Sequence, residues 1–286
     1  MTSINSIKKI ISNIKSELKD IYPREEIDSF IYLIFEDVLG FTRTQVLISP
    51  DIKLKQADVN RIKEITRELK QQKPIQHIIG KTIFYELPFK TSENALIPRP
   101  ETEELVNWLL SDHQNTDVDI LDIGTGSGCI AVSIAKNLPQ AKVLASDISE
   151  QALELAKENS RLNNVQVEFM KMDILDPSIK INKKLDVIIS NPPYITNKEK
   201  KLMQRNVLDY EPGLALFVPD EDPLLFYKSI INFGKKHLKS GGQIYFEINE
   251  VYGEETLKLF EKEYFGHTSL KKDVNGKSRM IKSILK

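Results

Sequence analysis

The sequence predicts an α/β fold, with a doubly wound parallel sheet in the C-terminal part of the chain and a small helical bundle before it. From about residue 117 onward, strand and helix patterns alternate, which is typical of a parallel sheet with helices on both faces. Before about residue 73, apolar side chains recur only at helical spacing. A glycine-rich turn and an Asn-Pro-Pro-Tyr turn each follow a predicted strand, which places a ligand site at one edge of the sheet.

The first part of the chain is expected to form three helices, each with one apolar face. The apolar positions are Ile7, Ile10, Ile11, Ile14 and Leu18 in the first helix, Ile27, Ile31, Ile34 and Val38 in the second, and Ile62, Ile65 and Leu69 in the third. Gly40 ends the second helix, and Pro74 ends the third. We therefore assign residues 1–73 to a helical domain.

Residues 74–100 are expected to link two domains. Ile83–Tyr85 and Leu87–Phe89 are short runs of β-forming residues, which predicts a hairpin. A helix that carries Leu105 and Leu109 follows the linker. The second domain is assigned to residues 101–286.

The second domain is expected to contain five strands in the order of a doubly wound sheet. The predicted strands are Val118–Leu121, Val143–Ala145, Val165–Phe169, Leu185–Ser190 and Ile244–Ile248, with helices at Ile130–Leu138 and from Ser149 to Leu162 between them. Ser149 is the expected N-cap of the second of these helices.

Composition excludes several classes of protein. The formal net charge is −1, so no overall basic field favours nucleic acid. The single cysteine, Cys129, allows no intramolecular disulfide, and four scattered histidines form no metal-ligand cluster, so we expect no metal. The chain carries no signal-peptide run and no apolar stretch of about 20 residues. We expect a cytoplasmic protein without membrane contact.

The first predicted strand runs into a loop with three alternating glycines. The loop is Gly124, Thr125, Gly126, Ser127 and Gly128, and a helix follows it directly. Glycine tolerates tight turns and lets the backbone approach a ligand closely. Both dinucleotides and S-adenosyl-L-methionine fit such a loop.

Two aspartates favour the second ligand. Asp122 precedes the first glycine, where a carboxylate suits the ammonium group of a methionine moiety and repels a pyrophosphate. Asp147 ends the second strand, where it is expected to accept hydrogen bonds from ribose hydroxyls; this contact fits either ligand.

The fourth strand ends in Asn191, Pro192, Pro193 and Tyr194, the most specific signal in the chain. The two prolines fix their own φ angles and bias Asn191 to an extended backbone, so the turn is stiff. The Asn191 side-chain carbonyl and a proline carbonyl can accept both hydrogens of one –NH2 group, while Tyr194 offers an aromatic face. Such a site positions a weakly nucleophilic sp2 nitrogen and stabilises the positive charge that grows on it during methyl transfer. We therefore expect Asn191, Pro192 and Tyr194 to be catalytic.

With these residues, the chain resembles the protein-(glutamine-N5) methyltransferases that act on peptide-chain release factors. The resemblance extends over nearly the whole chain. It rests on Pro74–Gly80 with Phe84, Leu96–Glu103, the Asn-Pro-Pro-Tyr turn, Tyr210–Pro212 with Ala215 and Leu216, and Asp273 with Gly276 and Arg279. The resemblance implies a Rossmann-like sheet that binds S-adenosyl-L-methionine.

The resemblance also implies roles for individual residues. The loop from Gly124 to Gly128, Asp147, Asp173 and Ile174 would bind the cofactor, together with Asn191. Asn191–Tyr194 would hold the glutamine of a Gly-Gly-Gln loop in a release factor. Ile174 stands where many members have an aromatic residue, and Asn249 where glycine is common. The helical domain would dock the release factor, and we expect a monomer.

Other functions stay open on the residues alone. Asn-Pro-Pro-Tyr is shared with amino-methyltransferases that act on adenine or guanine in nucleic acid, although near-neutral charge disfavours a stable complex of that kind. A non-catalytic module of the same fold and an NAD-dependent oxidoreductase are the remaining alternatives.

Overall fold

The computed structural model describes residues 5–201 and 203–286, which divide into two compact units. The helical unit ends at Gly80 and also includes Gln204–Tyr210. The sheet unit consists of Lys81–Met203 and Glu211–Lys286. Within the described ranges, no helix has both the length and the apolar character that a membrane crossing requires.

The helical unit is built on the apolar faces that the sequence predicts. Its helices are α1 (Ile7–Leu18), α2 (Arg24–Leu39), α3 (Arg43–Ile48), α4 (Gln56–Lys70), α5 (Ile75–Ile79) and α10 (Arg205–Tyr210). Every apolar position predicted to face inward on the first and third helices is buried except Ile11, which packs against the same core. Gly40 adopts φ 67° and ends α2. The predicted bundle is confirmed, while α3, α5 and α10 were not expected because they are too short for a periodic signal.

The short helix α10 joins the helical unit from a distant part of the chain. The polypeptide leaves the sheet unit after Met203 and returns to it at Glu211. The hydroxyl of Tyr210 donates a hydrogen bond to the backbone carbonyl of Gln71, with 3.0 Å between the oxygens. The helical unit is therefore discontinuous in sequence.

The predicted hairpin is present and forms β1 (Lys81–Phe84) and β2 (Leu87–Lys90). Its two turn residues, Tyr85 and Glu86, have positive φ angles of 49° and 62°, which are unfavourable for side chains of this size. The Tyr85 N–H donates to the carboxylate of Glu103 at 2.8 Å, which helps to hold the turn. Phe84 and Phe89 are buried edge to face in the core of the sheet unit.

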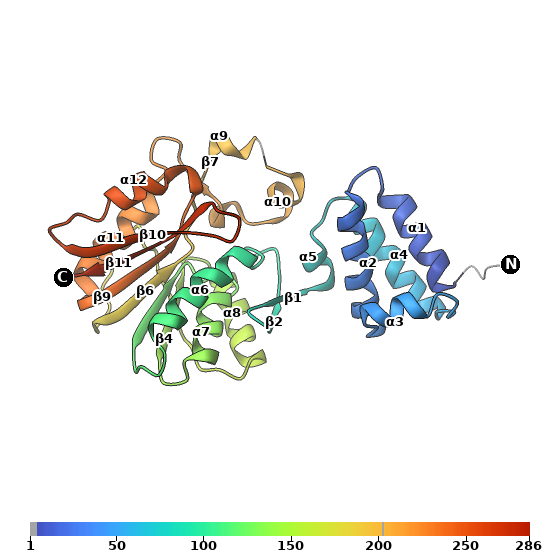
Figure 1. Cartoon of the computed structure of the whole chain (residues 1–286), viewed down its shortest axis with the longest axis horizontal. Coiled ribbons are helices and arrows are strands. Elements are labelled where there is room, and N and C mark those ends of the chain that lie inside the picture. Colours follow the sequence, from blue (N-terminus) through green and yellow to red (C-terminus); the bar gives the residue numbers. More distant parts are fainter. Residues whose placement is uncertain (1–4, 202) are drawn as a thin grey trace. The chain divides into compact units, whose positions relative to one another are not determined.

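The central sheet has seven strands in the order β10-β11-β9-β6-β3-β4-β5 (Figure 1). Their bounds are β3 (Asp119–Ile123), β4 (Lys142–Asp147), β5 (Glu168–Lys171), β6 (Leu185–Ser190), β9 (Leu238–Glu247), β10 (Phe265–Lys272) and β11 (Ser278–Leu285). The five strands from β5 to β9 are parallel, and β11 and β10 add to the β9 edge in antiparallel orientation. From β3 the chain winds outward through β4 and β5, then returns to the other side of β3 with β6. The strand order thus reverses between β3 and β6, where doubly wound sheets bind ligands.

Helices cover both faces of this sheet, as Figure 1 shows for α6, α7 and α8 on one face and α11 and α12 on the other. The bounds are α6 (Pro100–Asp112), α7 (Cys129–Asn137), α8 (Glu150–Leu162), α11 (Leu225–His237) and α12 (Gly253–Lys258). Smaller elements lie between β6 and α11, namely β7 (Ile195–Thr196), α9 (Asn197–Lys200) and β8 (Phe217–Val218). The predicted doubly wound α/β class is confirmed.

The third strand begins later than its sequence suggests. Val165 is held in the turn after α8, because its N–H donates to the Ser160 carbonyl at 3.1 Å and its carbonyl accepts from the Ser160 hydroxyl at 2.7 Å. Asn164 just before it has a positive φ of 54°. β-branched composition therefore predicted a strand where side-chain hydrogen bonding stabilises a turn.

Candidate active site

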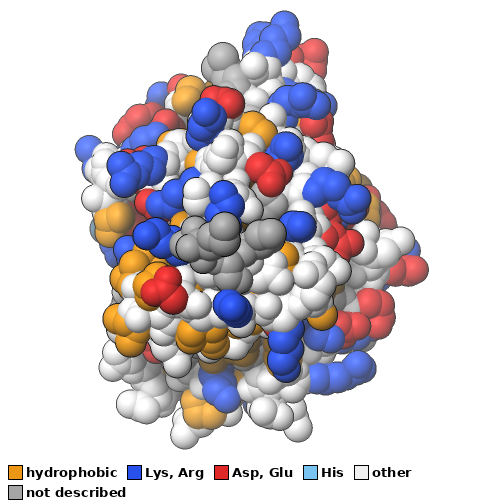
Figure 2. Space-filling view, turned by 90° about the vertical axis from the view of Figure 1, so that its right-hand side faces the viewer, with side chains coloured by type: hydrophobic (Ala, Val, Ile, Leu, Met, Phe, Trp, Pro, Cys, Tyr) orange, Lys and Arg blue, Asp and Glu red, His pale blue; other side chains and the backbone are white. Residues whose placement is uncertain are grey.

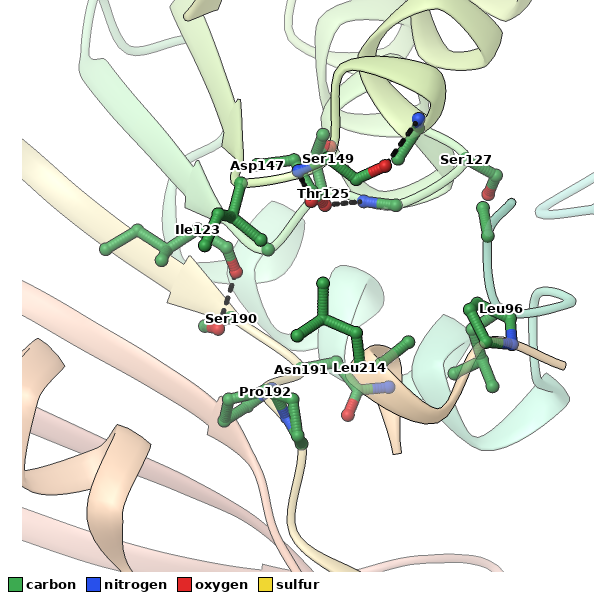
Figure 3. A pocket seen from close by; sticks show the side chains of 18 of the residues that line it. Leu96, Ile123, Thr125, Ser127, Asp147, Ser149, Ser190, Asn191, Pro192 and Leu214 are labelled. Atoms are coloured by element: carbon green, nitrogen blue, oxygen red, sulfur yellow. Dashed lines mark hydrogen bonds between the residues drawn. The ribbon is translucent and has the colours of Figure 1, made fainter. Parts of the chain in front are cut away.

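A cavity of about 220 Å³ opens at the carboxyl ends of the parallel strands. The glycine loop, the residues after β4 and β5, and the Asn-Pro-Pro turn after β6 all line it. Figure 3 shows Thr125 and Asp147 on one side of this space and Asn191 and Leu214 on the other. The sheet thus brings together segments that the sequence places about 70 residues apart.

The glycine loop is closed by its own hydrogen bonds. The N–H groups of Gly124 and Thr125 both donate to the Ser146 carbonyl at 2.9 Å, and the Gly128 N–H donates to the Thr125 carbonyl at 2.9 Å. The Gly126 N–H donates to Oδ2 of Asp147, also at 2.9 Å. Four of the five loop N–H groups are thus used inside the protein. A dinucleotide loop needs such groups for its pyrophosphate, so this loop does not suit that ligand.

The three glycines serve different purposes. All have positive φ angles, of 73° at Gly124, 56° at Gly126 and 82° at Gly128. A Cβ on Gly128 would lie 2.9 Å from the Cβ of Ala156 on α8, whereas a Cβ on Gly124 would meet no atom within 4 Å. The third glycine therefore permits close packing of α7 on α8, and the first provides only backbone conformation.

Asp147 is well placed to bind hydroxyl groups. Its Oδ1 accepts from the Ser149 N–H at 2.9 Å, and its Oδ2 accepts from Gly126. Each carboxylate oxygen keeps a further lone pair for a ligand in the cavity. Burial raises the pKa of Asp147, and the backbone N–H groups of Ser149 and Gly126 oppose that rise.

Asp122 lies beneath the loop and is not among the residues that line the cavity. The Thr125 hydroxyl donates to its Oδ2 at 2.6 Å. Burial raises the pKa of Asp122 to about 7, while the hydrogen bonds from Thr125 and from the Ala131 backbone oppose that rise. The predicted contact of Asp122 with an ammonium group stays a prediction, and in this structure the carboxylate lies behind the glycine loop and not in the lining of the cavity.

The turn after β6 presents an amide to the cavity. The Ser190 hydroxyl donates to the Ile123 carbonyl at 2.6 Å, which ties the end of β6 to the end of β3 (Figure 3). The Asn191 Nδ2 donates to the Thr102 hydroxyl at 3.2 Å. No hydrogen bond to Asn191 Oδ1 is found among the described residues. This carbonyl oxygen is thus available to a donor in the cavity, beside Pro192 and Pro193.

Tyr194 lies behind the turn and does not line the cavity. Its hydroxyl donates to Glu247 Oε1 at 3.1 Å, and its ring packs against the core around α11 and β9. Burial and the neighbouring charge of Glu247 raise the pKa of Tyr194. In this structure the tyrosine supports the turn from behind, and the aromatic contact with substrate stays a prediction.

Asn249 stabilises the same turn from the β9 side. Its φ of −66° needs no glycine. Its Nδ2 donates to the Tyr194 carbonyl at 3.1 Å and to the Glu199 carboxylate at 3.0 Å. The asparagine that departs from the common glycine therefore adds hydrogen bonds to the loop without strain.

The outer wall of the cavity was not predicted from the sequence as part of the site. It consists of Asn94–Arg99 and the segment from Pro212 to Ala215. The buried carboxylate of Glu211 joins these segments, because it accepts from Arg99 at 2.6 Å and from the Ile97 N–H at 3.2 Å. The Arg-Pro-Glu and Tyr-Glu-Pro motifs were the available signal, but 112 positions separate the two ion-pair partners.

The chemistry of the cavity fits S-adenosyl-L-methionine. Asp173, Ile174 and Ile148 all line the cavity, which therefore offers both acidic and aliphatic groups to a ligand. Among the described residues of that lining, the one cation is Arg99, which is already paired with Glu211. A positively charged sulfonium with a flat base and a ribose matches acidic and apolar walls, whereas a phosphate-bearing cofactor does not.

Comparisons with known proteins agree with this geometry. A family model described as "PrmC N-terminal domain" matches residues 9–80, and one described as "Methyltransferase small domain" matches residues 101–209. A release factor glutamine methyltransferase of Flavobacterium psychrophilum is 48% identical, with 96% of this chain and 98% of the relative covered. Another from Bacteroides thetaiotaomicron is 42% identical, with 96% and 99% covered.

A solved structure supports the fold. The crystal structure of a methyltransferase from Pyrococcus furiosus matches with a TM-score of 0.52 and 19% identity, over 81% of this chain and 98% of that one. The likeness in fold, the site chemistry and the full-length identity lead to the same conclusion. The chain belongs to the family of release factor glutamine methyltransferases, which use S-adenosyl-L-methionine.

Proposed function

We propose that this protein transfers the methyl group of S-adenosyl-L-methionine to the side-chain amide nitrogen of the glutamine in the Gly-Gly-Gln motif of peptide-chain release factors. The observation that carries the proposal is the pairing of a cavity suited to the cofactor with the unsatisfied carbonyl oxygen of Asn191 at its edge. The family relationship identifies the class of acceptor.

The residues of the cavity have different roles in binding the cofactor. Asp147 would hold the ribose hydroxyls, and Asp173 and Ile174, which also line the cavity, would contact the base. The bound cofactor supplies an electrophilic methyl group on a positively charged sulfur. The aliphatic side chains of the lining, among them Ile123, Ile148 and Ile174, would shield that group from water.

The turn after β6 prepares the acceptor nitrogen. Asn191 Oδ1 and the carbonyl of Pro192 accept the two amide hydrogens, and the stiff proline turn holds the nitrogen in line with the methyl group. Positive charge that develops on the nitrogen is stabilised by these two oxygens. As the nitrogen–methyl bond forms, the sulfur–methyl bond would break and leave a neutral thioether. The positively charged nitrogen would then release its proton to water, so no strong base beside the nitrogen is required.

We assign docking of the folded release factor to the helical unit. Leu47 and Ile48 of α3 are 63% and 72% exposed, and Ile52 nearby is 44% exposed. Exposed apolar groups of this kind favour a protein partner over nucleic acid. On the face shown in Figure 2, lysine and arginine side chains are mixed with aspartate and glutamate side chains. Changing Leu47 and Ile48 to serine should raise KM for an intact release factor and leave kcat unchanged.

The location and the assembly are further parts of the proposal. Release factors act at the ribosome, so we propose that the enzyme works in the cytoplasm, and as a monomer. Light scattering of the purified protein would test the monomer.

Mass spectrometry of a release factor after incubation with the enzyme and cofactor tests the proposed reaction. We expect one added methyl group on the glutamine of Gly-Gly-Gln. Two controls are matched to it: a release factor with that glutamine changed to alanine, and the Asn191→Ala enzyme. Incorporation of labelled methyl into DNA or RNA, with none into the release factor, would overturn the assignment.

A further inference from the structure

Four side chains from three distant segments of the sequence form a chain of hydrogen bonds at the Asn191–Tyr194 turn, here called the catalytic turn. Asn191 Nδ2 donates to Thr102 Oγ1 at 3.2 Å, and Thr102 Oγ1 lies 2.6 Å from Glu247 Oε2. The Tyr194 hydroxyl reaches the other carboxylate oxygen, Oε1, at 3.1 Å. Thr102 and Glu247 are each only 2% exposed, so water does not compete for these groups.

The Glu247 carboxylate determines the direction of every hydrogen bond in this series. An ionised carboxylate carries no hydrogen and can only accept. It therefore takes the single hydroxyl hydrogen of Thr102, which leaves that oxygen only lone pairs to offer. The Asn191 amide must then turn Nδ2 toward Thr102, and its Oδ1 faces the opposite way.

Without this constraint the amide could adopt either orientation. The oxygen and nitrogen of an asparagine amide have nearly the same size, and a free threonine hydroxyl pairs equally well with either. An inverted amide would present N–H groups to the N–H groups of a substrate amide, which is repulsive. The catalytic turn therefore needs a group that distinguishes the two orientations.

Burial raises the pKa of Glu247, and this rise is opposed by the hydrogen bonds from Thr102 and Tyr194 and by the positive charge of Arg279. Arg279 is itself held near this site by Asp273, with 3.4 Å between Nε and Oδ2. Thr102, Tyr194 and Arg279 thus each act against the effect of burial and stabilise the ionised form, which the direction of these hydrogen bonds requires.

We infer that Glu247, acting through Thr102, is a positioning residue that fixes the orientation of the Asn191 amide so that its carbonyl oxygen faces the substrate nitrogen. The inference rests on the proposed function and deepens it. Glu247 does not line the cavity and acts only through its neighbours.

Replacement of Thr102 tests the link between Glu247 and Asn191 most directly. Thr102→Val keeps the shape and removes the hydroxyl, and it should lower kcat roughly tenfold, as expected for one hydrogen bond in the transition state, with little change in KM. Thr102→Ser keeps the hydroxyl and should restore most of kcat. Equal kcat for Thr102→Val and the unchanged enzyme would contradict the inference.

A double-variant cycle separates positioning from general stability. Glu247→Gln introduces an N–H donor, and as a single substitution it should lower kcat. Added to Thr102→Val it should lower kcat much less, because the link from Glu247 to Asn191 is already broken. Independent, multiplicative losses would mean that Glu247 acts by another route. Calorimetry with the cofactor shows whether each variant is folded.

A measurement without release factor keeps this test apart from the proposed function. The side-chain amide signal of Asn191 in a nitrogen-15 spectrum, assigned by its loss in Asn191→Ala, should shift in Thr102→Val and Glu247→Gln and stay in place in Thr102→Ser. An unchanged signal in all variants would refute the positioning role. A failure of methyl transfer by the unchanged enzyme would instead refute the proposed function alone.

Discussion

The backbone N–H of Gly126 donates to Oδ2 of Asp147 across 2.9 Å, so the glycine loop after β3 and the end of β4 are held by one carboxylate. The same side chain also accepts from Ser149 at the start of α8. Asp147 therefore shapes the cavity as well as offering lone pairs to a ligand.

Asp147→Ala should weaken cofactor binding by about 10- to 100-fold. The change removes the hydroxyl-binding oxygens and two charge-assisted hydrogen bonds that hold the loop, each of which contributes on the order of 1.5–3 kcal/mol. Titration calorimetry with S-adenosyl-L-methionine measures the affinity. Unchanged affinity would show that the ribose is held elsewhere.

Asn191→Ala should reduce kcat by at least about a hundredfold and leave the affinity for the cofactor within a few-fold of its original value. The reason is that Nδ2 is bonded to Thr102, which leaves Oδ1 as the proposed acceptor for the substrate amide, and loss of one charge-stabilising acceptor commonly costs this much. Single-turnover methylation and calorimetry check the two halves separately. A parallel loss of cofactor affinity would instead make Asn191 part of the cofactor pocket.

Cofactor affinity should rise several-fold between pH 6 and pH 8. The pKa of Asp122 is raised to about 7, so in the free enzyme this carboxylate ionises as the pH rises through that range. Its negative charge then favours a positively charged ligand on the other side of the glycine loop. Asp122→Asn should abolish the dependence, which affinity measurements at several pH values would show. A slope that persists in this variant would have to come from another group.

Gly128→Ala should destabilise the protein by about 2–4 kcal/mol, and Gly124→Ala by about 1–2 kcal/mol. Both changes force alanine into a left-handed backbone conformation, but only at Gly128 does the new Cβ also meet Ala156 at 2.9 Å. Urea denaturation of the two variants gives the difference. Equal losses would mean that α7 shifts freely away from α8.

The parts of the site that could be predicted from the sequence are those in which adjacent residues define the geometry. The glycine loop and the Asn-Pro-Pro turn follow strands, and parallel strands bring their carboxyl ends to one edge whatever lies between them. Asp147 was found for the same reason. Asp173 and Ile174, which the resemblance indicated, also line the cavity.

The remaining parts depend on contacts between distant segments. Thr102 and Glu247 are 145 positions apart, and neither residue type by itself predicts a buried hydrogen bond. The orientation of Tyr194, which turns its hydroxyl to Glu247 and away from the cavity, is likewise a result of packing around β9. Sequence pattern and propensity indicate the secondary structure of a segment. Contacts between distant segments form only when the strands assemble into the sheet.

The return of α10 to the helical unit has a consequence for biosynthesis. Residues up to Gly80 leave the ribosome early, but their unit also includes Gln204–Tyr210, with Tyr210 hydrogen-bonded to Gln71. The helical unit emerges first, but it can be completed only after the glycine loop and the Asn191–Tyr194 turn have been translated. A nascent chain stalled before Arg205 should lack the protection of the Gln71 region against proteolysis that a chain stalled well beyond Tyr210 acquires.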